Sequence, residues 1–292
     1  MAKIPLLVVV GPTASGKSEY AVKAALREGG EIISGDSMQI YRRMDIGTAK
    51  PSKDEMCGIP HHLIDVCDMT EPFSAAKFVS LASVAIKDVS ERGKLPIVAG
   101  GTGLYIDTLI SGVNLAATED DPILRERLFK EAEEIGAEAF HEKLRSVDPE
   151  SAEAIHPNNV KRVVRALEIY HNTGMTKTEL DAKSRSNESV YDTYTVYIVP
   201  KERETIYERI DRRVGLMFEK GLVDEVESLV KDGLRQTPTA SQAIGYKEFY
   251  PYFDGICDLE AVKESICLDT RHYAKRQLTW FNRKPFDEII YI

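Results

Sequence analysis

The chain has 292 residues, of which 43% are hydrophobic and 29% are charged, and its formal net charge is −9. This length and composition predict a globular protein with one large core, or one core plus an inserted excursion. No apolar run approaches the roughly 18 to 20 residues of a membrane span, so we expect none. The acidic balance argues against indiscriminate nucleic-acid binding, so any RNA contact must come from local basic patches.

The first predicted element is a buried strand, residues 4–10, that leads into a glycine-rich loop. The strand is rich in β-branched residues, as in the centre of a parallel sheet. The loop matches the pattern G-x-x-x-x-G-K-[ST], in which backbone N–H groups surround a phosphate, a lysine adds positive charge and a hydroxyl ligates Mg²⁺. It consists of Gly11, Pro12, Thr13, Ala14, Ser15, Gly16, Lys17 and Ser18, and Ser18 is the predicted metal ligand.

A helix over residues 17–28 is predicted next, with the positive end of its dipole toward the same anion. A bare glycine turn leaves Lys17 and Ser18 unexplained, so the context of strand, loop and helix favours a polyphosphate site. The loop does not identify the polyphosphate, because ATP, GTP and an allylic diphosphate present similar oxygens.

A second strand, residues 31–34, ends just before Asp36. Short strands that alternate with helices predict a doubly wound α/β core with a parallel sheet, whose ligands lie beyond the carboxyl ends of the strands. At such an end, Asp36 either closes a turn through its own backbone or acts on a substrate beside residues 11–18, which we call the phosphate loop. Position alone leaves both interpretations open.

The next strand, residues 95–100, follows a predicted helix over 74–93 and runs into Gly100, Gly101, Thr102 and Gly103. This strand end carries no acid to hold Mg²⁺ and orient a water, which argues against NTP hydrolysis. A simple strand-to-helix turn explains one glycine better than three. We therefore expect the glycines to let a flat ligand approach the backbone.

The segment from residue 113 to 190 is predicted to be an all-helical insertion, with the core formed by residues 1–112 and 191–292. Asp121 and Asp148 each precede a proline and are predicted to cap helices, and Asn158 or Asn159 begins a further helix. The polar side of that helix carries Lys161, Arg162 and Arg165. Such charges usually mark a solvated face, although insertions at the ligand side of a sheet commonly form lids or partner surfaces.

The core is predicted to resume with a strand at 193–199 and a helix that carries Arg209, Arg212 and Arg213, one of which is a candidate to neutralise leaving oxygens. A last long helix, 259–282, and an edge strand end the chain. Cationic and aromatic residues are interleaved near the end of this helix. They suit contacts to RNA phosphates and bases, or else an amphipathic helix whose aromatic side chains lie in the core. They are Arg271, Tyr273, Lys275, Arg276, Trp280, Phe281, Arg283 and Lys284.

The four cysteines and the adjacent His61 and His62 show no metal-ligand spacing. We therefore expect buried, reduced thiols and a structural or substrate-edge role for the histidines. The cysteines are Cys57, Cys67, Cys257 and Cys267.

Seven stretches of the chain, taken together, resemble the bacterial tRNA dimethylallyltransferases, in that family's order and over nearly the whole chain. They are GPTASGKS, GDSMQIYRRMDIGTAKP, GGTGLY, NNVKRVVRALEIY, ERIDRRVGLMFEKGLVDEV, QAIGYKE and RHYAKRQLTWFNR. The resemblance implies transfer of a dimethylallyl group from dimethylallyl diphosphate to the exocyclic amine of the adenosine immediately 3′ of the anticodon, with release of diphosphate. Its implied partners are dimethylallyl diphosphate and the anticodon stem-loop of tRNA, and its implied cofactor is Mg²⁺.

The resemblance also assigns roles. It implies Asp36 as the general base, the phosphate loop and Arg213 as the grip on the diphosphate, and Thr102 as a contact of the target nucleotide or the diphosphate. Implied tRNA contacts are Asp36, Ser37, Met38, Gln39, Thr102, Arg125, Asn159, Lys161 and Arg162, to which the basic patch adds Arg271, Lys275 and Arg276.

Two other classes remain as alternatives: a P-loop nucleotide or small-metabolite kinase, and a non-catalytic RNA-binding module. A kinase shares the phosphate loop, the α/β core and arginines from late helices. An RNA-binding module accounts for the basic helices but leaves the phosphate loop beside Asp36 unexplained. We expect a cytoplasmic monomer with no membrane contact.

Overall fold

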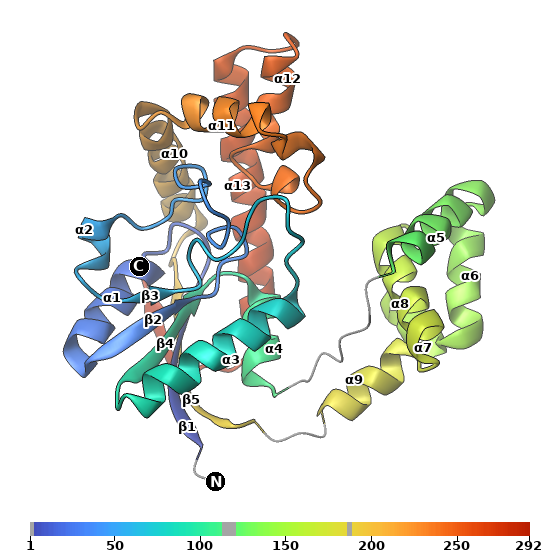
Figure 1. The fold of residues 1–292 in the computed structure, drawn as a ribbon, viewed down its shortest axis with the longest axis horizontal. Helices are drawn as coiled ribbons and strands as arrows, with labels where there is room; N and C mark the ends of the chain where they lie inside the picture. Colours follow the sequence, from blue (N-terminus) through green and yellow to red (C-terminus); the bar gives the residue numbers. More distant parts are fainter. Residues whose placement is uncertain (1–2, 113–120, 186–188) are drawn as a thin grey trace. The chain divides into compact units, whose positions relative to one another are not determined.

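The computed structural model describes residues 3–112, 121–185 and 189–292 (Figure 1). The chain divides into two compact units, Met1–Ile110 with Val190–Ile292, and Ser111–Ser189. The start of the predicted insertion, at residue 113, lies outside the described residues.

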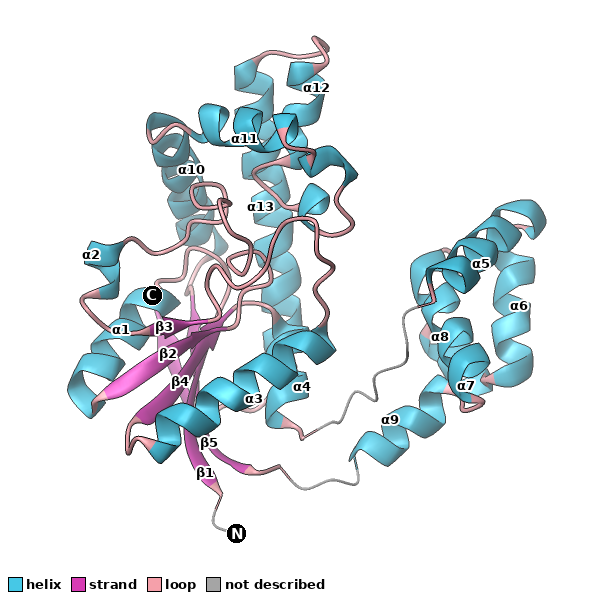
Figure 2. Ribbon diagram, in the orientation of Figure 1, coloured by secondary structure: helices cyan, strands magenta, loops and turns pink. Residues whose placement is uncertain are grey.

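The first unit is built on a parallel six-stranded sheet (Figure 2). Its order is β3-β2-β4-β1-β5-β6, and every neighbouring pair is parallel. The predicted α/β class is therefore confirmed, and the last strand lies at an edge of the sheet, as predicted. The strands are β1 (Ile4–Val10), β2 (Gly30–Ser34), β3 (His61–His62), β4 (Leu95–Gly100), β5 (Tyr191–Val199) and β6 (Glu288–Tyr291).

Both faces of the central strand β1 are buried, and its side chains alternate between two cores. Val9 packs with Ala21 and Ala25 of α1 (Lys17–Glu28), whereas Val8 and Val10 belong to the larger core. That core is shared with α3 (Ala75–Glu91), α4 (Gly103–Ile110), α10 (Arg203–Glu219) and α13 (Leu259–Phe281). The alternation places helices on both faces, as expected for a strand with period-two side chains.

The remaining helices of this unit lie among its long connections. They are α2 (Lys53–Met56), α11 (Leu222–Lys231) and α12 (Tyr250–Phe253), with short 3₁₀ turns at Leu234–Gln236, Ala240–Gln242 and Lys247–Phe249. The apolar stretch after His62 leaves the sheet at once, because Leu63 and Asp65 adopt left-handed backbone angles, with φ of 63° and 58°.

The second unit is helical in its described residues and has its own core around Leu128, Phe140 and Leu167. The Asp121 carboxylate accepts a hydrogen bond from the Leu124 N–H, at 2.9 Å, so this predicted cap is confirmed. Asp148 caps its helix in the same way. The described helices of the second unit are α5 (Pro122–Ile135), α6 (Ala137–Val147), α7 (Pro149–Ala154), α8 (Val160–Thr173) and α9 (Lys177–Arg185).

All four cysteines are free, but the expectation that they are buried is confirmed only for Cys67: Cys257 and Cys267 are half-buried and Cys57 is exposed. Cys57 adopts φ of 49° at the end of the short helix α2, where its side chain meets solvent. Within residues 3–112, 121–185 and 189–292 no group of three or more His, Cys, Asp or Glu side chains is arranged to hold a metal. In the same ranges no helix combines the length and apolarity required to cross a membrane.

Candidate active site

The phosphate loop leaves β1 in a conformation that depends on small residues. Gly16 has φ of 84°, and a Cβ at Gly11 would lie 2.5 Å from the Ile198 carbonyl oxygen of the neighbouring strand β5. Helix α1 begins at Lys17, so its first N–H groups, which have no partner within the helix, point toward the loop. Such backbone donors make the loop a candidate anion site.

Lys17 supplies a positive charge that depends on its protonation state and therefore on pH. Its ammonium donates to the Pro12 carbonyl oxygen at 3.3 Å. Burial lowers the pKa of Lys17 to about 8; the negative charge of Asp36 opposes this shift and the positive charge of Arg213 adds to it. Lys17 is therefore mainly protonated near neutral pH and loses its charge in mildly alkaline solution.

Helix α10 carries four arginines, Arg203, Arg209, Arg212 and Arg213, and of these only Arg213 lines the cavity beside the phosphate loop. Its guanidinium donates to the Thr13 hydroxyl at 3.1 Å. Burial lowers the pKa of Arg213, while Asp36 and Glu55 act in the opposite direction, and the very high reference pKa of arginine keeps the group charged. Arg212 is exposed, and Arg209 donates to the Ala14 carbonyl oxygen at 3.4 Å.

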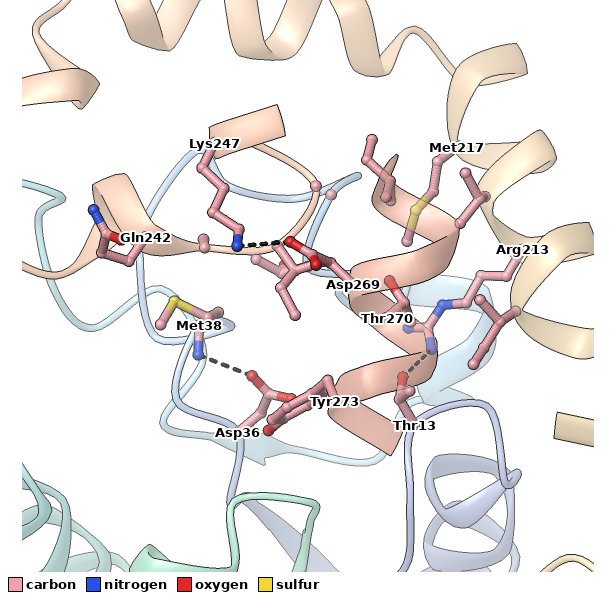
Figure 3. A pocket seen from close by; sticks show the side chains of 18 of the residues that line it. Thr13, Asp36, Met38, Arg213, Met217, Gln242, Lys247, Asp269, Thr270 and Tyr273 are labelled. Carbon is pink, nitrogen blue, oxygen red and sulfur yellow. Dashed lines mark hydrogen bonds and ion pairs between the residues drawn. The ribbon is translucent and has the colours of Figure 1, made fainter. Parts of the chain in front are cut away.

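Asp36 meets both interpretations that its position left open. Its Oδ1 accepts hydrogen bonds from the N–H groups of Met38, at 2.8 Å, and Gln39, at 3.3 Å, so it closes a turn. The same carboxylate lines the cavity (Figure 3). The Thr102 hydroxyl lies next to this turn and accepts from the Ser37 N–H at 3.1 Å.

The cavity has a volume of about 310 Å³ and is formed within the first unit. Figure 3 shows Thr13, Asp36, Arg213 and Tyr273 around it, contributed by the phosphate loop, the turn after β2, α10 and α13. It therefore combines cationic and hydroxyl groups on the loop side with a carboxylate. Such a site can hold an anionic group and a proton-donating group side by side.

One wall of this cavity was predicted only in part: Tyr273 and Arg276 belong to the basic and aromatic row named from the sequence, whereas Asp269 and Thr270 were not expected. Asp269, Thr270, Tyr273 and Arg276 of α13 line it, and Lys247 pairs with Asp269 at 2.7 Å. Burial, with the charge of Asp36 adding to it, raises the pKa of Tyr273 to about 12, so the phenol stays protonated. The spacing of these residues, three or four apart, is the signal that marks one face of a helix.

Residues 100–103 after β4, which we call the glycine loop, pack against protein atoms at the positions where we expected a ligand. A Cβ on Gly100 would lie 2.3 Å from the Gly35 carbonyl oxygen, and one on Gly101 would lie 2.1 Å from Gln277 Nε2. On Gly103 it would lie 2.4 Å from the Trp280 ring. Close packing of the chain against itself is sufficient reason for the three glycines, so they no longer indicate a flat ligand by themselves.

The end of α13 does not present a free row of cations and aromatics. Arg271 pairs with Asp211, and Lys284 pairs with Asp107, which also accepts from the Trp280 indole N–H at 2.8 Å. Phe281 is buried in the core, as the amphipathic alternative expects, and Tyr273 lines the cavity. Lys275, Arg276 and Arg283 are exposed.

The remaining predicted tRNA contacts lie on the segment after Asp36 and in the second unit, and only some of them line the cavity or are exposed. Of the segment after Asp36, Ser37 and Met38 line the cavity, whereas Gln39 donates to the backbone of Thr48 at 3.3 Å. In the second unit, Asn159, Lys161 and Arg162 are exposed at the start of α8. Arg125 instead pairs with the buried Glu168, at 2.8 Å, as Arg165 does.

The chain matches a family model described as IPP transferase over residues 39–284. It is 50% identical to the tRNA dimethylallyltransferase of Geobacillus thermodenitrificans over 283 residues, which cover 97% of this chain and 89% of the relative. It is 46% identical to that of Bacillus subtilis over 282 residues, with coverage of 97% and 89%.

Solved structures of tRNA prenyltransferases also resemble this chain. The crystal structure of the full-length tRNA isopentenylpyrophosphate transferase from Bacillus halodurans superposes with a TM-score of 0.72 at 45% identity, covering 99% of this chain and 90% of that one. A eukaryotic dimethylallyltransferase acting on tRNA superposes with a TM-score of 0.82 at 32% identity, covering 94% and 69%. These matches do not favour the kinase alternative. The chain belongs to the tRNA dimethylallyltransferase family, the IPP transferases, and is an enzyme of prenyl transfer.

Proposed function

We propose that the chain transfers a dimethylallyl group from dimethylallyl diphosphate to the exocyclic amine of the tRNA adenosine immediately 3′ of the anticodon. The observation that carries this proposal is that Thr13, Arg213 and Asp36 line the same cavity, with Asp36 across from Arg213 (Figure 3). An anion site beside a carboxylate suits a reaction that expels diphosphate and takes a proton from an amine. The proposed setting is the cytoplasm, where tRNA substrate is available.

The phosphate loop and its cations stabilise the leaving group in this proposal. As the allylic C–O bond breaks, negative charge collects on the diphosphate oxygens. Lys17, the N–H groups at the start of α1 and Arg213 are positioned in advance, so they stabilise that charge without reorganising. Thr13, held by Arg213, forms the wall of the cavity next to the allylic carbon.

Asp36 takes the proton. The adenine amine is a weak nucleophile because its lone pair is delocalised into the ring, and loss of its proton raises electron density on nitrogen as the N–C bond forms. The proton goes to the Asp36 carboxylate, and the C–O electron pair leaves with the diphosphate. The two backbone N–H groups that bind Oδ1 keep the carboxylate oriented, which leaves its other oxygen for the amine.

The residues present fit a bound Mg²⁺. Mg²⁺ usually takes one or two protein oxygens and completes its shell with phosphate oxygens and water. The Ser18 hydroxyl at the first turn of α1 supplies such an oxygen, and the buried hydroxyl of Ser15, three residues earlier in the loop, has no hydrogen-bond partner among the described residues. When bound, Mg²⁺ neutralises diphosphate charge.

The proposed RNA partner is an anticodon stem-loop. An unpaired loop base can be extruded into a cavity at a cost of a few kcal/mol, roughly the price of unstacking. Contacts are proposed from Ser37, Met38 and Thr102 near the base, from Lys275 and Arg276 on α13, and from Lys161 and Arg162 on α8.

The charge state of Lys17 predicts a pH dependence. Because the folded pKa lies near about 8, the ammonium is present below that pH and lost above it, so kcat/KM for dimethylallyl diphosphate should fall on the alkaline side with a midpoint near about pH 8. Initial rates across about pH 6 to 10 measure this. In Lys17→Arg the guanidinium keeps its charge, so the alkaline fall should disappear. A fall of the same midpoint in that variant assigns it to another group.

Reversal of charge on α8 tests the RNA surface. Lys161→Glu with Arg162→Glu should weaken tRNA binding by about 10- to 100-fold at low salt, because each contact to a phosphate contributes electrostatically, and should reduce its salt dependence. Filter binding at several salt concentrations measures this, with the affinity for dimethylallyl diphosphate unchanged. The matched control is Lys130→Glu with Lys143→Glu on α5 and α6. Equal loss in both double variants indicates a general charge effect rather than a site.

Incubation with unmodified tRNA and Mg²⁺, plus either dimethylallyl diphosphate or ATP, tests the proposed function. The expected result is a mass gain of one dimethylallyl group on one adenosine, with the allylic donor only. Phosphate transfer from ATP to a small acceptor, without any change in the tRNA, would instead support the kinase alternative.

A further inference from the structure

Gln277 of α13 holds two loops of the active site together with one side chain. It is buried, with 5% of its surface exposed. Its Oε1 accepts from the Thr13 N–H at 2.8 Å, and its Nε2 donates to the Gly101 carbonyl oxygen at 3.0 Å. The phosphate loop and the glycine loop are thus joined through a residue more than 170 positions away from either.

This bridge needs a side chain that accepts a hydrogen bond at one atom and donates one at another, as a primary amide does. The Thr13 N–H can only donate and the Gly101 carbonyl can only accept, so the orientation of the amide is determined by its partners. Neither an apolar side chain nor a carboxylate serves both. The close approach also explains Gly101, because any Cβ there would overlap the amide nitrogen at 2.1 Å.

The two bonded loops carry groups of the proposed mechanism. Thr13 is held from both sides, its N–H by Gln277 and its hydroxyl by Arg213. Gly101 precedes Thr102, whose hydroxyl accepts from the Ser37 N–H, and Ser37 follows Asp36. A short path of hydrogen-bonded groups therefore leads from the phosphate loop through Gln277 to the turn that carries Asp36, the proposed general base.

We propose that Gln277 is a positioning residue that sets the spacing between the diphosphate-binding loop and the carboxylate of Asp36. It touches neither substrate and acts through Thr13 on one side and through Gly101 and Thr102 on the other. The inference deepens the proposed function and rests on it for the identity of the substrates. Its first consequence, the geometry of the anion site, is measurable with inorganic diphosphate alone.

Gln277→Met removes both hydrogen bonds while keeping a side chain of similar length. It should weaken the binding of inorganic diphosphate by about tenfold, as expected when a loop loses one fixed hydrogen bond, and it should lower kcat for transfer further, because the base is displaced as well. Isothermal calorimetry measures the affinity and single-turnover assays measure the transfer. Both effects should be independent of pH relative to the unaltered chain.

Gln277→Glu gives the sharper readout. When ionised, the carboxylate accepts from the Thr13 N–H but repels the Gly101 carbonyl; when protonated, it has one acceptor and one donor, as the amide has. Burial raises the pKa of such a group, so lowering the pH from about 8 to about 6 should restore its diphosphate affinity toward that of the unaltered chain measured at the same pH. Such a recovery shows that diphosphate affinity depends on the hydrogen bond donated to the Gly101 carbonyl.

The matched control is Thr237→Val. Thr237 is also 5% exposed, and its hydroxyl likewise accepts from a backbone N–H, that of Ser241, and donates to a backbone carbonyl, that of Leu234. It should lower the melting temperature about as much as the Gln277 variants do, yet leave diphosphate affinity unchanged.

Three outcomes overturn the proposal: normal diphosphate affinity in folded Gln277→Met, an affinity ratio for Gln277→Glu that does not change with pH, or an equal loss in Thr237→Val. If Gln277→Met does not fold, the pH series on Gln277→Glu decides alone. Failure of the proposed function is distinguishable, because then the unaltered chain modifies no tRNA while the comparison of diphosphate affinities still stands.

Discussion

Asp36→Ala is expected to lower kcat by about 10²- to 10⁴-fold, the usual contribution of a general base, while tRNA affinity stays within about tenfold. The carboxylate is the only acid on the turn after β2, and it lines the cavity opposite Arg213. Without it the adenine amine keeps its proton until the N–C bond is nearly formed. Single-turnover transfer to tRNA, with both substrates saturating, measures the effect.

Asp36→Asn separates catalysis from the structural role of this residue. The amide oxygen still accepts from the N–H groups of Met38 and Gln39, so the turn is preserved, but the side chain no longer takes up a proton. We expect Asn to be almost as damaging to kcat as Ala and much less damaging to stability. If Asp36→Asn turns over normally, Asp36 serves the turn alone and another group takes the proton.

Arg213→Ala and Lys17→Ala are each expected to lower kcat/KM for dimethylallyl diphosphate by about 10²- to 10³-fold, the range found when one preorganised donor to a developing anion is removed. Arg213→Ala also frees the Thr13 hydroxyl that its guanidinium holds at 3.1 Å. Rapid-quench single-turnover kinetics at varied dimethylallyl diphosphate concentration separate lost binding from lost transition-state stabilisation.

Arg212→Ala is the matched control, since Arg212 neighbours Arg213 on α10 but is exposed and does not line the cavity. Its kinetics should remain those of the unaltered chain. Equal losses in Arg212→Ala and Arg213→Ala indicate a general effect of positive charge on this helix. Normal single-turnover rates in Arg213→Ala or Lys17→Ala remove that residue from the grip on the diphosphate.

Local elements were predictable because their causes are local. The β-branched run of β1, the loop of small residues and the helix over 17–28 follow one another within a single stretch, and α1 spans those residues. The strand at 95–100 and the cap at Asp121 were also correctly predicted. In each case the signal, either side-chain period or a capping residue, lies within a few positions of the element that it determines.

The composition of the cavity was less accessible. Residue spacing could not choose Arg213 over Arg209 or Arg212, because the choice depends on how α10 is rotated against the phosphate loop; only the family resemblance singled out Arg213. The glycines at 100, 101 and 103 carried a clear signal of close approach, but the sequence does not name the approaching group. The structure shows Gly35, Gln277 and Trp280.

By itself, the sequence determined the parallel α/β core, the position of the phosphate loop and the helical character of the inserted segment. Tertiary structure alone decided that α13 forms a wall of the cavity, and that Gln277 joins Thr13, 264 positions away, to Gly101. The physical reason is range: side-chain periods and turn preferences act over a few residues, whereas the partners of a buried polar group are chosen by the packing of distant elements.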